Sequence, residues 1–164
     1  MNQIIVKKAS VFSLILGACL GLILHIPSYT IVALVLMVLL FLSSVLIILF
    51  MKKDEKHLSF IDTRDGAVLG GIAGFFATLG AFASFTPMAY MIYFINHGNY
   101  FGSLAHLFIN EAFWLLCIVA FMASFIFACT NSATGMGLAY ILKFFDSKKM
   151  PENSDAQIDI EIND

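Results

Sequence analysis

Charged residues are scarce in this sequence: Asp, Glu, Lys and Arg make up 12% of the 164 residues. Ordinary soluble domains contain about twice that share. So few charges cannot cover the surface of a soluble globule, and the mean hydropathy is +0.92. The composition therefore excludes a soluble enzyme, a nucleic-acid-binding protein and a disordered chain, and it predicts an integral membrane protein.

The common sequence signatures of catalysis are absent. The chain contains no Walker loop, no GxSxG and no HExxH. Its three cysteines, Cys19, Cys117 and Cys129, form no CxxC pair, so we expect packing thiols that are buried. Only one acid, Glu111, lies within an apolar run, whereas intramembrane hydrolysis needs paired acids, a metal or a nucleophile with a base. We therefore expect no enzyme activity, no cofactor and no metal.

Four long apolar runs are present, at about 9–26, 31–51, 66–86 and 104–128. A bilayer core about 30 Å thick requires about 20 helical residues, so each run is long enough to cross it. The runs do not alternate between apolar and polar residues, which excludes barrel strands. Because a backbone in lipid must satisfy its own hydrogen bonds, the fold class is predicted to be all-α, an integral membrane four-helix bundle in residues 1–146.

The lysines and arginine predict the orientation. Connections 27–30 and 96–103 contain no Lys or Arg, so all nine cations fall on one side of a four-span arrangement. Positively charged short loops stay in the cytoplasm, which places both termini there. Two alternatives are a cleaved secretory signal peptide, suggested by Lys7 and Lys8 before an apolar run, and a bacterial lipoprotein cleavage box at Leu16–Cys19. However, the residues after Cys19 stay apolar, and a retained helix explains the charge pattern better. The cations are Lys7, Lys8, Lys52, Lys53, Lys56, Arg64, Lys143, Lys148 and Lys149.

Three segments outside the predicted spans have an expected structure. Residues 147–164 contain several acids and few bulky side chains, which predicts a flexible, acidic cytoplasmic tail. Pro87 either kinks the third span or ends it, and if it ends it, residues 88–95 form a short interfacial helix. The polar island 129–137 is expected to interrupt the helix, so that residues 136–146 lie along the inner membrane interface. A less favoured alternative is that this island is an unwound segment lining a transport site.

Small residues recur every fourth position in the third predicted span. Gly66, Gly70 and Gly74 form one row, and Ala73 and Ala77 belong to a neighbouring row. Such rows let two helix backbones approach closely in lipid, within one bundle or between protomers. Span one contains a shorter motif, Gly17 and Gly21, as a partner. We therefore expect span three at the centre, against spans one and four, with the smooth Leu/Val/Ile surface of span two facing lipid.

The outer end of the predicted bundle gathers a candidate polar site. Its residues are Glu111, His106, His25, His97 and Asn110. Ionisable groups within a membrane span suggest a function by default. Three interpretations compete: Glu111 hydrogen-bonds neighbouring side chains and locks the outer ends together, or it carries a proton or cation, or it binds zinc with the histidines. The first is favoured, because the close ligand spacing of a metal site is missing.

These patterns predict a small multi-pass membrane protein that is a non-enzymatic structural, accessory or assembly subunit. The alternative is a small transporter or channel that uses Glu111, and a membrane-disrupting protein is a more distant third. The expected partners are the lipid bilayer and another protein or a second copy, bound through the glycine-rich helix faces, and no nucleic acid. The layout is similar to that of small bacterial four-span proteins in architecture rather than in motif, so a bacterial cytoplasmic membrane is the expected location.

Overall fold

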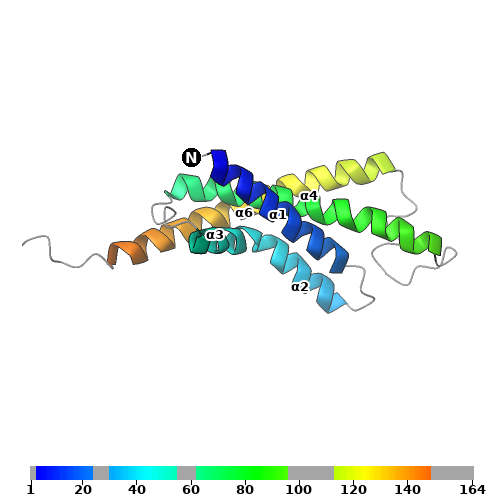
Figure 1. The fold of residues 1–164 in the computed structure, drawn as a ribbon, viewed down its shortest axis with the longest axis horizontal. Helices are drawn as coiled ribbons and strands as arrows, with labels where there is room; N and C mark the ends of the chain where they lie inside the picture. Colours follow the sequence, from blue (N-terminus) through cyan, green and yellow to red (C-terminus); the bar gives the residue numbers. More distant parts are fainter. Residues whose placement is uncertain (1–2, 24–29, 55–61, 96–112, 149–164) are drawn as a thin grey trace, which may run out of the picture.

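The computed structural model describes residues 3–23, 30–54, 62–95 and 113–148, and within them every residue except Leu42 and Asp62 is helical (Figure 1). The all-helical prediction is confirmed for these residues. The helices are α1 (Gln3–Ile23), α2 (Thr30–Phe41), α3 (Ser43–Asp54), α4 (Thr63–Ile95) and α6 (Phe113–Lys148).

Three of these helices, α1, α4 and α6, are long and apolar enough to cross a membrane. Their apolar stretches cover Gln3–Ile23, Thr63–Ile92 and Trp114–Phe145. Helices α2 and α3 have 12 residues each, which is too short for either to cross alone. The described structure is therefore consistent with a membrane protein and contains three candidate spans.

Helix α4 lies at the centre, with its most extensive contacts to α6 and α1 (Figure 1). Gly17 of α1 lies against Ala77, and Gly21, further along, lies against Ala81 and Ser84, so α1 runs parallel to α4. The contacts with α6 run in the opposite sense, because Gly66 faces Ala139 whereas Gly74 faces Phe127. The α4–α6 pair is therefore antiparallel.

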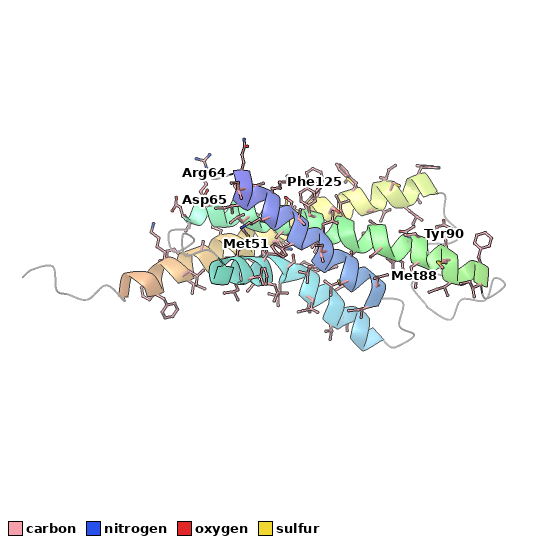
Figure 2. The ribbon with its side chains drawn as sticks, in the orientation of Figure 1. Met51, Arg64, Asp65, Met88, Tyr90 and Phe125 are labelled. Atoms are coloured by element: carbon pink, nitrogen blue, oxygen red, sulfur yellow. The ribbon has the colours of Figure 1, made fainter. Side chains whose placement is uncertain are left out.

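The start of α4 and the end of α6 lie at the same end of the molecule. The Lys143 ammonium is 3.6 Å from the Asp62 carboxylate, and both side chains are exposed, so the pair adds little stability. Because α1 runs parallel to α4, Lys7 and Lys8 lie toward this end as well. Figure 2 shows Arg64 and Asp65 here and Tyr90 toward the opposite end. The cations of the described helices thus gather at one end.

Of the two alternatives for Pro87, the one in which it ends the span and residues 88–95 form a separate interfacial helix is wrong, because α4 continues through Pro87 to Ile95. Proline removes one hydrogen bond and pushes its ring toward the carbonyl of the residue four positions earlier, which is Ala83. Both Pro87 and Ala83 are exposed, so the ring is accommodated on the outer face of the helix. On the inner face Phe85 and Ala89 are buried, and tertiary packing of this kind maintains the helix.

The expected break at 129–137, with a separate helix at 136–146, is also wrong. Helix α6 runs without interruption from Phe113 to Lys148. The polar side chains bond to their own helix instead of ending it: the Thr130 hydroxyl donates to the carbonyls of Ile126 and Phe127, and Thr134 donates to the carbonyl of Asn131. Such bonds leave the i to i−4 ladder in place.

The break falls in the second predicted span, which is divided at Leu42 into α2 and α3. The expectation that this span faces lipid is compatible with part of α2, where Leu34, Val35, Met37 and Val38 are exposed. It is wrong for the residues around and after the break. There the inner face packs against α1, α4 and α6, and the buried residues are Leu40, Ser43, Ser44, Ile47, Ile48 and Met51.

The three cysteines are exposed, which corrects the expectation of buried thiols. On α1 the buried positions next to Cys19 are Gly17, Leu20 and Gly21. Because these residues occupy the face that packs on α4, Cys19 is turned to the outside.

Candidate functional site

The polar residues predicted at the outer end are not part of the described structure. Glu111, His106, His25, His97 and Asn110 all lie outside the described residues, as do residues 149–164 of the predicted tail. Among the residues described, no group of three or more His, Cys, Asp or Glu side chains could hold a metal ion. The candidate site is therefore built from the buried polar side chains of the packed helices.

Asn131 of α6 forms the centre of this site, and its side chain is fully buried. Its amide Nδ2 donates a hydrogen bond of 3.1 Å to the Leu40 carbonyl, and its Oδ1 accepts one of 3.0 Å from the Ser44 backbone N–H. Leu40 and Ser44 are four residues apart, the spacing of a helical hydrogen bond. The Asn131 amide thus takes the place of one bond in the backbone ladder, where α2 ends and α3 begins.

The interruption is local. The Leu42 N–H donates to the Val38 carbonyl at 2.9 Å, and the Leu46 N–H donates to the Leu42 carbonyl at 3.1 Å. The helical hydrogen-bond ladder therefore resumes directly on both sides of the inserted side chain. Insertion of a side chain into the i to i−4 ladder is one of the few established causes of a sharp helix kink.

Hydroxyl groups complete the arrangement. The Ser43 hydroxyl donates to Asn131 Oδ1 at 3.2 Å, and the Ser44 and Thr134 hydroxyls are 2.6 Å apart. The Asn131 Nδ2 also donates to the Phe127 carbonyl at 2.9 Å. We call Leu40, Ser43, Ser44, Asn131 and Thr134 the Asn131 clamp. Across the described residues every buried side-chain nitrogen and oxygen has a hydrogen-bond partner.

The glycine row of α4 supplies the space for the clamp. A Cβ atom on Gly74 would lie 2.7 Å from Asn131 Cβ and 2.8 Å from Nδ2, and one on Gly70 would meet the Asn131 carbonyl. Gly66 faces Gly135 and Ala139 of the same helix. The predicted glycine row therefore packs on α6, at and beside Asn131. Real Cβ atoms almost never approach this closely, so only glycine allows the observed separation of the two backbones.

The alanine row of α4 faces the other way, toward α1. Ala73 and Ala77 are fully buried, and Gly17 lies on the Ala77 backbone. The structure thus places the Gly17 and Gly21 motif against the alanine row, whereas the sequence suggested the glycine row as its partner. The Ser84 hydroxyl adds a bond of 2.9 Å to the Ala18 carbonyl of α1.

Sequence reasoning missed the role of Asn131, Ser43 and Ser44. It identified 129–137 as a polar island but assigned it to a break at the membrane edge. The available signal was a pair of adjacent serines in a Leu/Val/Ile run and one carboxamide in another apolar run. Polar side chains of this kind hydrogen-bond across helices in membrane proteins.

The clamp consists of neutral groups: one carboxamide, three hydroxyls and backbone amides. Its members can exchange hydrogen bonds but present no group that titrates near neutral pH. The chemistry that this arrangement supports is therefore specific helix–helix recognition.

Comparison with known proteins adds no assignment: the sequence matches no protein-family model, no curated protein and no solved structure.

Proposed function

We propose that the chain is a small, non-enzymatic structural or accessory subunit of a membrane. The Asn131 clamp is the observation that carries the proposal, because it joins three helices, α2, α3 and α6, through neutral and fully paired groups. Backbone-close packing of α1, α4 and α6 at the glycines adds rigidity. A polar network in which every member is satisfied rigidifies a core and specifies one arrangement of its helices.

The outer surface supports partners of apolar character. Many large apolar side chains of α4 and α6 are exposed, among them Met91, Phe94, Trp114, Met122 and Ile126. In a bilayer such faces meet lipid chains or other membrane helices. We therefore propose lipid and a membrane-embedded protein, or a second copy, as the partners. A complex that stays together in mild detergent, with a fixed mass by light scattering, is the expected result; a monomer of 18.1 kDa plus bound detergent and lipid would contradict this partner proposal.

We propose a four-span topology in which α2 and α3 together form one broken crossing. Thr30–Asp54 would then cross as a unit of about 37 Å, enough for a core of about 30 Å. The parallel α1 and α4, the antiparallel α6 and the cations at one end all support this topology. Because positively charged short loops stay in the cytoplasm, we propose that both termini are cytoplasmic. The membrane that we propose is a bacterial cytoplasmic membrane.

Cysteine labelling tests this topology. In a background without native cysteines, Asn99→Cys should react with a membrane-impermeant maleimide from outside intact cells. Glu55→Cys should react only after the membrane is permeabilised, because the connection between the second and third predicted spans, residues 52–65, carries four of the nine cations. Labelling of Glu55→Cys in intact cells would refute the orientation.

A second candidate function, a small transporter or channel, is favoured by one observation. Transporter substrate sites are often formed at discontinuous helices, and the α2–α3 helix is discontinuous at Leu42. In this hypothesis Glu111 carries the proton or cation. The structural-subunit proposal is preferred, because Asn131 occupies the Leu40 carbonyl and the Ser44 N–H at the break.

Flux measurements separate the two functions. The protein is reconstituted in vesicles that contain a pH-sensitive dye, with empty vesicles as the reference. We expect no proton flux above the reference, and equal traces for wild type and Glu111→Gln, because a structural carboxyl is well replaced by an isosteric amide. Proton uptake by wild type that disappears in a folded Glu111→Gln variant would favour transport, since glutamine cannot ionise.

A further inference from the structure

The α2–α3 segment lacks the two residues that most strongly disfavour a helix. Residues 31–54 include neither glycine nor proline, and sharp kinks otherwise arise at small-residue pairs or at inserted side chains. Hydroxyl residues alone do not break helices in this protein. Ser13 donates to the Ala9 carbonyl and Ser124 to the Ala120 carbonyl, and both α1 and α6 stay continuous. Ser43 and Ser44 differ in that their hydroxyls bond to α6.

We propose that Asn131 imposes the break from outside, and that α2–α3 is a two-state element: broken while the Asn131 amide is inserted, continuous when it is withdrawn. Withdrawal leaves the Leu40 carbonyl and the Ser44 N–H, which are four residues apart, without the Asn131 amide as their partner. Each group needs a partner in an apolar environment, and the nearest one is the other. Closing that bond, together with the neighbouring ladder bonds across Leu42, converts two helices of 12 residues into one.

The two halves are anchored unequally, which determines which half moves. Helix α3 is held in a buried cluster, in which Ile47, Ile48 and Met51 pack with Ala9, Leu69 and Ala73. Of the α2 side chains whose burial the structure describes, Leu40 is buried in the core and Leu39 packs partly buried against it, and Phe41 makes a ring contact with Phe127, with centroids 4.6 Å apart. When the helix closes, α3 stays in place and α2 swings with respect to α4. Insertion or withdrawal of the Asn131 side chain thus controls the position of α2.

Spin-label distances in vesicles test the proposal. In a chain without native cysteines, labels are placed on α2 at Leu34→Cys and on α4 at Met91→Cys, both exposed positions. A second pair, Val68→Cys and Ile141→Cys, reports whether α4 and α6 remain packed. We expect Asn131→Ala to shift the main Leu34–Met91 distance by several ångströms and to leave the Val68–Ile141 distance unchanged. Thr130→Val, a change on the next residue of α6, should shift neither.

Two further variants make the test decisive. Asn131→Thr is too short to bridge both backbone groups and should give the same shift as Asn131→Ala. Adding Ser44→Pro to Asn131→Ala should restore the wild-type distance, because proline has no N–H to close the bond but fits the first turn of a helix. A wild-type Leu34–Met91 distance in folded Asn131→Ala and Asn131→Thr would overturn the proposal. Loss of the Val68–Ile141 distance in both variants would overturn it as well, because only α2 is expected to move.

Discussion

Asn131→Ala should lower the free energy of unfolding by about 2–4 kcal/mol, the largest loss expected from removing one side chain in this protein. A single interhelical hydrogen bond within a membrane contributes only about 0.6 kcal/mol on average and about 1.7 at most. Asn131 is different because it serves two backbone groups, Leu40 and Ser44, and a hydroxyl, Ser43, at once. Each buried group that loses its partner costs about 1–3 kcal/mol, and closing the helix to restore pairing sacrifices the packing of α2 instead.

Reversible unfolding in detergent, followed by far-ultraviolet circular dichroism, measures this loss. Thr130→Val is the matched control on the same helix. The Thr130 hydroxyl bonds only to carbonyls one turn earlier in α6, so its removal should change stability by less than about 0.5 kcal/mol. Equal stability of the Asn131→Ala and Thr130→Val variants would show that the clamp does not hold the helices together.

Gly70→Leu should produce the second large effect, because a side chain at this position has no space. Even a Cβ atom would meet the Asn131 carbonyl, and it would lie 3.1 Å from the Gly135 Cα. Both obstacles belong to the backbone of α6, so relief requires the two helices to separate. Overpacking in a well-filled core typically costs about 1–3 kcal/mol, and more where no neighbour can move. We expect loss of the folded protein, or a fall in melting temperature of about 10 °C or more.

Two other glycines provide controls of matched chemistry. A Cβ on Gly137 would meet nothing within 4 Å, so Gly137→Leu should leave the melting temperature nearly unchanged. A Cβ on Gly71, adjacent to Gly70, would lie 3.7 Å from its nearest neighbours, an ordinary contact. Gly71→Ala should therefore be neutral or stabilising by up to about 1 kcal/mol, since alanine favours helix over glycine. Equal melting temperatures for Gly70→Leu and Gly137→Leu would refute the central position of α4.

The candidate site was only partly accessible from the sequence. The rows Gly66–Gly70–Gly74 and Ala73–Ala77 were visible as spacing, because helical geometry alone places every fourth residue on one face. Spacing does not say which neighbour each row meets. That the glycine row lies on α6 and the alanine row on α1 was decided by the packing, in which Gly70 accommodates the backbone of Asn131.

Composition, apolar run length and charge position by themselves determined the helical class, the presence of helices long and apolar enough to cross a membrane, and the gathering of Lys7, Arg64 and Lys143 toward one end. These properties depend on quantities that can be read along the sequence without any long-range contact: apolar content, the rise of a helix per residue and the positions of the charges. The places where helices continue or break were decided by the tertiary structure. Pro87 does not end α4, because its missing bond lies on an exposed face and buried neighbours hold the helix. The break at Leu42 has no glycine or proline nearby, and there the Leu40 carbonyl accepts a hydrogen bond from the side chain of Asn131, 91 residues further along the chain. A hydrogen bond between residues so distant in sequence exists only once the helices have packed, so no local pattern encodes it.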